Sequence, residues 1–345
     1  MKEERVTAVA HANIALVKYW GKRPGEGNLP AVGSLSIGLE ALAATTRLAF
    51  ADGADSVLFN GEAAAPDKTG RILGYLDLWR RRFGADAHFA VDTRNNFPTG
   101  AGLASSAAGF AALALALDRL LGVGLGEQAL SQMARQGSGS AARSIFGGFV
   151  ELQLLGEDPA AKRLMSAEDW PLEVLVAITD ASEKPLGSTE AMRRTAATSP
   201  YYDAWVASHP DDLARARGAV LGRDFSLLAE VAEHNCLKMH AALMSSNPPI
   251  VYWSDATLAV MHRVRQVRAD GLAAFFTVDA GPQVKVVCDA TALTQVREQL
   301  VAIPGVREVI HSAIGGEPEI VLEKSLDAED TSQNTLSLDT SAAGA

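Results

Sequence analysis

Hydrophobic positions along the first half of the chain recur with two periods, one of about two residues and one of about 3.6 residues. The longer period predicts helices at Arg71–Phe83, Leu103–Leu121 and Glu127–Arg135. The shorter period and short apolar runs predict β-strands at Val6–His11, Thr45–Phe50, Val57–Asn60, Ala87–Thr93, Gly148–Leu154 and Val174–Asp180.

From about residue 182 onward, helical periodicity predominates. The expected helices are Ser188–Ala197, Asp211–Val220, Phe225–Met244 and Ala256–Asp270. A hairpin-like pair of strands then follows, at Ala274–Val278 and Val284–Cys288. After it we expect a helix at Thr291–Val301 and two closing strands at Val306–Ile310 and Ile320–Glu323. We therefore expect a first domain at residues 1–181, an α+β domain at 182–324 and a disordered acidic tail at 325–345, which has too little apolar surface to fold.

The length of 345 residues suits two domains, and the shares of 48% hydrophobic and 21% charged residues are typical of a soluble globular protein. The longest apolar stretch, Ala107–Leu117, is too short to span a bilayer. Near the N-terminus, His11, Asn13 and Lys18 interrupt the apolar core that a signal peptide needs. We therefore expect a cytoplasmic enzyme.

The formal net charge is −10, and the expected tail contributes −4 of it. Without a polybasic segment, neither nucleic acid nor a membrane surface is an expected partner. Any anionic substrate must be held by a local cluster of cations. Cys236 and Cys288 match neither a disulfide framework nor a zinc pattern, so we expect no structural metal.

A glycine-rich segment joins an expected strand to the long alanine-rich helix. Glycines let the backbone approach a ligand closely, and a helix start offers unpaired N–H groups that suit phosphate. The segment lacks the ending of a Walker A loop, so it predicts another kind of phosphate loop; the alternative is a plain turn with a serine cap. It reads Pro98-Thr99-Gly100-Ala101-Gly102-Leu103-Ala104-Ser105-Ser106.

This string resembles the ATP loop of the GHMP small-molecule kinase superfamily. Three further segments, Asn13–Lys22, Arg135–Ser144 with Gly147-Gly148-Phe149, and Thr277–Pro282, look like those of the diphosphomevalonate decarboxylase family, in the same order and spacing. The resemblance extends from about residue 7 to residue 323. One departure is Val32, where the family usually has Asn, which we expect to weaken polar contacts near the substrate entrance.

The resemblance implies an α+β, two-domain GHMP-kinase-like fold, with an N-terminal ATP-loop α/β domain and a C-terminal ferredoxin-like α+β domain. It implies ATP-dependent decarboxylation of 5-diphosphomevalonate to isopentenyl diphosphate, with ATP as co-substrate and Mg²⁺ as cofactor. The tertiary 3-hydroxyl is phosphorylated first, and phosphate and carbon dioxide then leave together. A homodimer is expected on the same ground.

Three residues are the expected catalytic set. Phosphorylation calls for a carboxylate that acts as base or orienter, and Asp279 is the candidate, although an Asx turn would also explain an Asp before Ala-Gly. Decarboxylation benefits from a guanidinium that grips the substrate carboxylate in two places, and Arg143 is the candidate. The alternative is that Arg143 is an exposed arginine on a helix. The resemblance implies that Lys18 lies near the substrate carboxylate and the transferred phosphate.

The remaining candidates bind substrate, nucleotide or metal. Within the matched string 233–240, Glu233, Asn235, Met239 and His240 are expected to pack or join hydrogen-bond networks. Ser105 is also the candidate Mg²⁺ ligand. The expected substrate-binding residues are Tyr19, Lys22, Ser138, Ser140, Ser188 and Arg193, and the expected nucleotide-binding residues are Pro98, Gly100, Gly102, Leu103, Ala104, Ser105 and Ser106.

Three alternatives stay open at this point. Relatives decarboxylate mevalonate 5-phosphate or a 3,5-bisphosphate. A mevalonate-type kinase would stop after phosphorylation, but the Lys-Tyr-Trp-Gly-Lys string argues against it. An ATP-binding regulator on the same fold would be expected to lack Asp279 or the glycine loop, and both are present.

Overall fold

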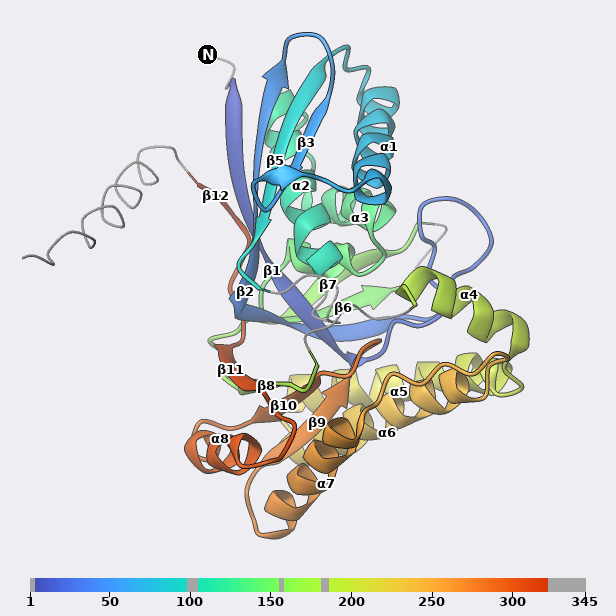
Figure 1. Cartoon of the computed structure of the whole chain (residues 1–345), viewed down its shortest axis with the longest axis vertical. Helices are drawn as coiled ribbons and strands as arrows, with labels where there is room; N and C mark the ends of the chain where they lie inside the picture. The colour runs from blue at the N-terminus through green and yellow to red at the C-terminus, as the bar shows by residue number, and fades with distance from the viewer. Residues whose placement is uncertain (1–3, 98–104, 155–157, 181–185, 322–345) are drawn as a thin grey trace, which may run out of the picture.

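The computed structural model describes residues 4–97, 105–154, 158–180 and 186–321. Within those ranges the strands form an eight-stranded and a four-stranded sheet. The larger sheet belongs to the upper half in Figure 1 and the smaller sheet to the lower half. The expected α+β class with two domains is confirmed.

The eight-stranded sheet is organised around two long antiparallel strands, which pair from Arg5↔Ala49 to Val17↔Leu35. The strand order is β12-β1-β2-β5-β3-β4, with β6 paired to β2 and β7 paired to β6. The strands are β1 (Arg5–Val17), β2 (Ser34–Ala51), β3 (Ser56–Phe59), β4 (Glu62–Ala63), β5 (His88–Asn95), β6 (Phe149–Gln153), β7 (Ala160–Met165) and β12 (Glu319–Val321).

Three helices cover one face of this sheet: α1 (Pro66–Phe83), α2 (Ser105–Leu121) and α3 (Glu127–Gly137). Most residues of α2 are buried alanines and leucines. Such small side chains let α2 pack closely on β1 and β2, and the apolar interior of the upper half collects around it.

The four-stranded sheet has the order β11-β8-β10-β9, and every neighbouring pair is antiparallel. In chain order its elements read strand, helices, strand, strand, helix, strand, which is the ferredoxin-like arrangement. The C-terminal architecture expected from the sequence is therefore confirmed. Its strands are β8 (Glu173–Ile178), β9 (Ala274–Val278), β10 (Val284–Cys288) and β11 (Glu308–Ala313).

Five helices belong to the lower half: α4 (Ser188–Thr198), α5 (Tyr202–Gly222), α6 (Phe225–Met244), α7 (Asp255–Ala269) and α8 (Leu293–Val301). Helix α5 begins well before the expected start at Asp211, because Pro210 lies inside the helix and does not begin it. Among the described residues, no helix combines the length and the apolarity needed to cross a membrane.

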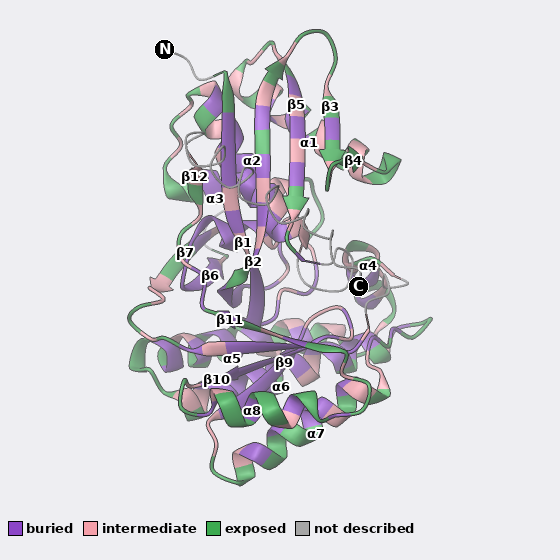
Figure 2. Ribbon diagram, turned by 60° about the vertical axis from the view of Figure 1, so that its left-hand side comes forward, coloured by how far each residue is buried: buried purple, intermediate pink, exposed green. Residues whose placement is uncertain are grey.

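The two halves share one apolar core. Buried residues of β1 and β2 pack with those of β8, α5 and α6, and Figure 2 shows buried positions running along β1 and β2 into the lower half. The expected division at residue 182 falls after β8, although β8 pairs with β10 and β11. Strand β12, from the other side of that division, pairs with β1. The tail at 325–345 lies outside the described residues.

Candidate active site

Asp279 follows β9 directly, and two lysine ammonium groups hold its carboxylate. Nζ of Lys18 lies 2.7 Å from Oδ1, and Nζ of Lys285 lies 3.2 Å from Oδ2. Lys18 follows the end of β1, whereas Lys285 is an inward-facing residue of β10. Both lysines are almost fully enclosed, and the carboxylate is 23% exposed. Two of the expected catalytic residues, Lys18 and Asp279, are therefore in contact with each other, and Lys285 adds a cation that the sequence motifs do not include.

The charges around Asp279 determine its protonation. Burial alone would raise its pKa, but the charges and hydrogen bonds of Lys18 and Lys285 outweigh burial and hold the pKa well below its ordinary value. For Lys285, burial lowers the pKa, and the charge of Asp279 opposes that shift. Asp279 is therefore ionised at neutral pH and only weakly basic, which suits orientation of a hydroxyl better than early proton abstraction.

Arg143 lies in the short 3-10 helix Ala141–Ile145 and is 2% exposed. Its guanidinium donates from Nη1 to Oγ of Ser34 (2.6 Å), from Nε to Oγ of Ser36 (3.0 Å) and from Nη2 to Oδ1 of Asn13 (3.1 Å). Burial lowers its pKa to about 10, against the opposing charges of Tyr19 and Asp279. Arg143 thus stays charged, and its acceptors are neutral groups that leave the charge uncompensated.

Tyr19 lies between Arg143 and Gly139, the residue between Ser138 and Ser140. The guanidinium carbon of Arg143 lies 5.9 Å from the centre of the Tyr19 ring, within range of a cation–π contact. A Cβ at Gly139 would stand 2.1 Å from the Tyr19 hydroxyl oxygen, so only glycine admits the ring at this position. Burial raises the pKa of Tyr19 to about 12, and its hydroxyl stays protonated and able to donate.

Lys22 follows on the same irregular segment. Its ammonium donates to Oδ1 of Asn28 at 2.7 Å and to Oγ1 of Thr189 at 3.1 Å. Burial, together with the charge of Arg71, lowers the pKa of Lys22. Thr189 is the neighbour of Ser188, the first residue of α4, so the contact brings the expected residues Lys22 and Ser188 into one region.

The hydroxyls of Ser106, Ser138 and Ser140 form a chain. The Oγ atoms of Ser106 and Ser138 are 3.1 Å apart, and those of Ser138 and Ser140 are 3.4 Å apart. The expected helix start at this position is a five-residue 3-10 helix, Ala141–Ile145. So short a helix has little dipole. The expected binding of diphosphate oxygens by Ser138 and Ser140 therefore depends on hydroxyls and nearby cations, and it stays a prediction.

Arg193 is the expected substrate residue that the described structure does not bring to the cluster. Its side chain is 74% exposed and pairs with Glu190 one turn earlier on α4, at 2.8 Å. The expected contribution of Arg193 to substrate binding stays a prediction.

The expected ATP loop is described only in part. Pro98, Gly100, Gly102, Leu103 and Ala104 lie outside the described residues, whereas Ser105 and Ser106 form the first turn of α2. Among the described residues, no three His, Cys, Asp or Glu side chains gather in a metal-binding group. Serine hydroxyls at the start of α2 are oxygen donors that suit Mg²⁺, which takes its other ligands from phosphates and water. The residues present therefore fit a nucleotide-borne Mg²⁺.

A buried polar network supports Lys18 from the lower half. Oδ1 of Asn235 accepts the backbone N–H of Lys18 at 2.8 Å, and Nδ2 of Asn235 donates to Asp212 at 2.7 Å. Beside it, Nε2 of His209 bonds the carbonyl of Gly33 at 2.8 Å. The interpretation of Asn235 as a hydrogen-bonding residue agrees with these contacts, and through them α5 and α6 fix the start of the Lys18 segment.

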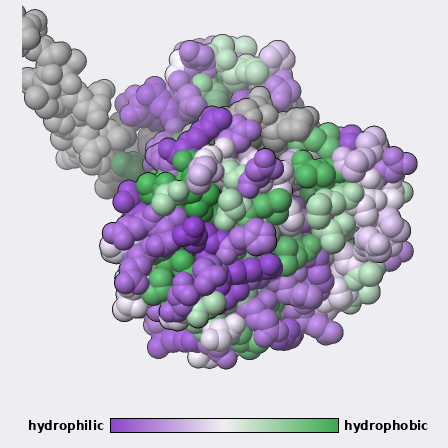
Figure 3. Space-filling view, turned by 60° about the horizontal axis from the view of Figure 1, so that its bottom comes forward, coloured by the Kyte–Doolittle hydropathy of each residue, from purple (hydrophilic) through white to green (hydrophobic). Residues whose placement is uncertain are grey.

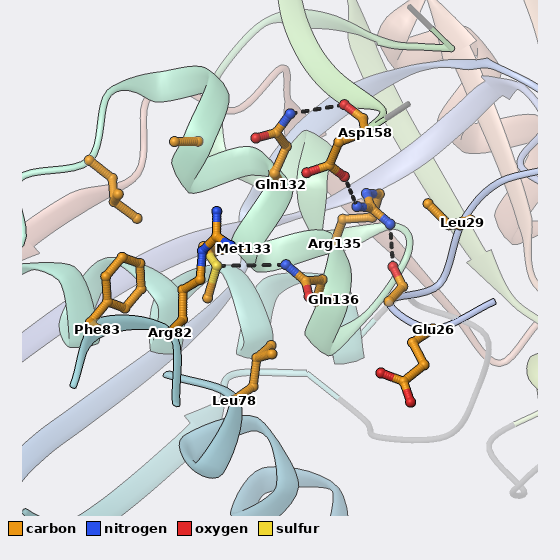
Figure 4. A pocket seen from close by; sticks show the side chains of 13 residues that line it. Glu26, Leu29, Leu78, Arg82, Phe83, Gln132, Met133, Arg135, Gln136 and Asp158 are labelled. Carbon is orange, nitrogen blue, oxygen red and sulfur yellow. Dashed lines mark hydrogen bonds and ion pairs between the residues drawn. The ribbon is translucent and has the colours of Figure 1, made fainter. Parts of the chain in front are cut away.

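A cavity of about 330 Å³ lies beside this site, between α1, α3 and the loop that precedes β2. Figure 4 shows Arg135 between Asp158 and the Gly27 carbonyl at its wall, with Gln132 and Gln136 nearby. None of the expected site residues that the structure describes lines this cavity.

Val32 is 3% exposed within an apolar cluster that includes Trp20, Met192 and Trp205. The expectation that Val32 weakens polar contacts at a substrate entrance finds no support in this location. Its methyl groups fill a core position, where an unpaired amide would be costly.

Fold and site together define a two-domain α+β enzyme of the GHMP type, with a cluster of cationic and hydroxyl side chains between its halves. The family model for the diphosphomevalonate decarboxylase-like N-terminal domain matches residues 10–161. The model for the mevalonate 5-diphosphate decarboxylase C-terminal domain matches residues 174–341. The chain belongs to the diphosphomevalonate decarboxylase family.

Individual relatives agree with this assignment. The chain is 36% identical over 303 residues to diphosphomevalonate decarboxylase mvd1 of Aspergillus fumigatus, covering 81% of this chain and 75% of the relative. It is 36% identical over 302 residues to the Homo sapiens diphosphomevalonate decarboxylase, covering 80% and 75%. 

Among solved structures, the crystal structure of mevalonate diphosphate decarboxylase from Staphylococcus aureus superposes with a TM-score of 0.88 at 36% identity. The structure of MDDEF in complex with MVAPP, AMPPCP and magnesium superposes with a TM-score of 0.86 at 36% identity. Each comparison covers 92% of this chain and 98% of the other.

Proposed function

We propose that this chain catalyses the ATP-dependent decarboxylation of (R)-5-diphosphomevalonate to isopentenyl diphosphate, releasing ADP, phosphate and carbon dioxide. The observation that carries the proposal is the ionised Asp279 between Lys18 and Lys285, beside the cluster of Arg143, Tyr19 and Lys22. Such a site supplies one carboxylate to align a hydroxyl and several cations for a multiply charged substrate.

In the first step, Asp279 accepts the hydrogen bond of the 3-hydroxyl and turns an oxygen lone pair toward the γ-phosphorus of ATP. Phosphoryl transfer has a loose transition state, so the nucleophile needs no prior deprotonation. As the new P–O bond forms and the bond to ADP breaks, the bridging oxygen becomes strongly acidic. Even a weakly basic Asp279 then takes the proton, and Lys18 compensates charge on the transferred group.

In the second step, the C3–O bond breaks with phosphate as leaving group, and the electron pair of the bond to the carboxylate becomes the new double bond. Carbon dioxide leaves from the same intermediate. Arg143 holds the substrate carboxylate. The hydrogen bonds that the guanidinium donates to Ser34, Ser36 and Asn13 keep it in a fixed orientation. Tyr19, Lys22, Ser138, Ser140 and Ser188 bind the diphosphate.

Nucleotide binding would use the segment from Pro98 to Ser106, and Ser105, at the start of α2, would hold the nucleotide's Mg²⁺. A bound Mg²⁺ would supply neutralisation of phosphate charge. Activity is expected to vanish with a chelator and to return with Mg²⁺. A chain ending before Ser325 is expected to keep full activity.

The substrate is tested by measuring ADP and carbon dioxide release with mevalonate, its 5-phosphate and its 5-diphosphate in parallel. Release of both products in a 1:1 ratio from the 5-diphosphate is the expected result. Equal or faster turnover of the 5-phosphate would mark a monophosphate decarboxylase. Release of ADP without carbon dioxide would mark a kinase, and either outcome would refute the proposal.

We further propose a cytoplasmic homodimer that engages neither nucleic acid nor membrane. The lower face in Figure 3 carries hydrophilic side chains with smaller hydrophobic areas among them. Each protomer contains both Asp279 and Arg143, close enough for their charges to interact. Mixing an Asp279→Asn chain with an Arg143→Ala chain should therefore restore no activity. Recovery toward a quarter of the wild-type rate would mean that sites are shared between protomers.

A further inference from the structure

Asn28 lies in the loop between β1 and β2, and its two chain neighbours, Gly27 and Leu29, line the cavity beside α3. Its φ of 56° is in the left-handed region. Asparagine tolerates this conformation better than most residues because its short side chain can hydrogen-bond nearby. Specific contacts of the side chain are therefore needed to hold the loop in this form.

Asn28 makes those contacts in two directions. Nδ2 donates to the carbonyl oxygens of Arg135 (3.2 Å) and Gln136 (2.9 Å), which end α3. Oδ1 accepts from the ammonium of Lys22 at 2.7 Å, and the backbone oxygen accepts from the Tyr19 hydroxyl at 3.2 Å. The side-chain amide thus joins the C-terminal turn of α3 to Lys22, and the backbone carbonyl of the same residue holds the Tyr19 hydroxyl.

The contact is reciprocal. Nη1 of Arg135 donates to the carbonyl of Gly27, and the same guanidinium binds Asp158 and the carbonyl of Pro159. Arg135 is 2% exposed. The segment of Gly27 and Asn28 is therefore fastened to α3 from both sides, and α3 gives the loop a rigid support.

The chemistry of the amide matters for Lys22. An ammonium has three N–H donors, and those of Lys22 face Asn28, Thr189 and one further direction. Both acceptors are neutral, so they orient the ammonium without cancelling its charge. A carboxylate at position 28 would also orient Lys22 but would compete with an anionic ligand for it.

We propose that Asn28 is a positioning residue of the diphosphate subsite, which aims Lys22 and Tyr19 at the substrate from a support on α3. This inference rests on the proposed function for the identity of the substrate. Asn28 touches no reacting atom, so its loss should weaken substrate binding more than the chemical step.

The first test is Asn28→Gly, which removes the side chain and keeps the left-handed backbone without strain. We expect KM for 5-diphosphomevalonate to rise about tenfold, with kcat within about threefold of wild type and KM for ATP unchanged. Arg223→Gly is the matched control, because Arg223 also has a positive φ of 53° and lies at the end of α5. An unchanged KM in Asn28→Gly would overturn the proposal.

A double-mutant cycle separates positioning from a general effect on folding. In a Lys22→Met background, Asn28→Gly should raise KM by less than about threefold, because the group that it aims is gone. Full additivity of the two substitutions would contradict the proposal. If Asn28→Gly fails to fold, Asn28→Asp replaces it, and a KM within twofold of wild type in that variant would also contradict the proposal.

The same cycle can be measured without turnover, by calorimetric binding of inorganic pyrophosphate to the four proteins. If the wild type did not decarboxylate 5-diphosphomevalonate, the proposed function would fail while this measurement still decided the role of Asn28. Weaker pyrophosphate binding in Asn28→Gly, with little further loss in the Lys22→Met background, supports positioning. Equal affinity of wild type and Asn28→Gly refutes it.

Discussion

Oδ2 of Asp279 lies 3.2 Å from the ammonium nitrogen of Lys285, whose side chain is fully enclosed in β10. The hairpin of β9 and β10 brings the two together, since Lys285 is the partner of Thr277, two residues before Asp279. The carboxylate therefore has a cation on each oxygen. These two cations lower the basicity of Asp279, so the proposed chemistry depends on how Asp279 orients the substrate hydroxyl.

Replacing Lys285 by methionine should make Asp279 more basic. Loss of a cation within hydrogen-bonding distance raises a carboxylate pKa by about one to three units. We expect the acid limb of the kcat/KM profile to move to higher pH in Lys285→Met, whereas the wild type keeps Asp279 ionised well into acid. Profiles measured from about pH 3 to pH 9 test this, and superimposable acid limbs would contradict it.

Asp279→Asn should retain ATP binding and lose turnover by about 10²- to 10⁴-fold. The amide keeps the shape of the carboxylate but offers one acceptor oxygen without charge and cannot take the proton of the hydroxyl. Single-turnover formation of ADP, with nucleotide binding measured by calorimetry, checks both parts. A kcat near that of wild type would remove Asp279 from the mechanism.

Arg143→Lys should lower kcat by about 10²-fold, because an ammonium cannot bond Ser34, Ser36 and Asn13 at once and also grip a carboxylate in two places. Arg215→Lys is the matched control, since Arg215 is 46% exposed and pairs with Glu230 on the surface. Steady-state kinetics decide the outcome. If only KM rises, Arg143 serves substrate binding and not decarboxylation.

Acid should destabilise the fold through His209. Burial lowers its pKa to about 4, below the ordinary 6.5, against the hydrogen bond that His209 makes to the carbonyl of Gly33 and the charge of Asp212. The unfolded chain therefore binds more protons between pH 6.5 and 4, and the free energy of unfolding falls as pH falls through that window. The loss attributable to His209 is about 3 kcal/mol.

His209→Gln checks this expectation, because the amide can still donate to the carbonyl of Gly33 and does not titrate. Urea unfolding at a series of pH values should give a flatter pH dependence for the variant than for the wild type. We expect the variant to keep some pH dependence of stability because of His240, since burial lowers the pKa of this residue to about 3. Equal slopes in the two proteins would exclude His209 as the sensitive group.

Elements whose signal is local could be predicted from the sequence. The hairpin of β9 and β10 and the helix α6 have the expected bounds, because their periodicity and turn residues lie within short segments. Strand β7 was missed, since Ala160–Met165 mixes polar and apolar residues and pairs only with β6 among the described strands. The membership of β8 in the second sheet depends on distant partners that no local pattern encodes.

The site divides in the same way. Lys18, Arg143 and Asp279 could be named from short strings, whereas Asn28 reads locally as an ordinary loop residue near Gly25 and Gly27. Its importance comes from contacts with α3, more than a hundred residues away. Lys285 carried a detectable signal, a lysine inside the apolar run of β10, where a buried charge requires a partner.

Strand β12 completes the outer edge of β1 through the pairs Thr7↔Val321 and Val9↔Glu319. During synthesis on the ribosome, β1 emerges first and must wait for nearly the whole chain before this neighbour exists. An open strand edge can recruit other nascent chains. Helix α2 packs against β1 and β2, and all three elements are synthesised long before β12.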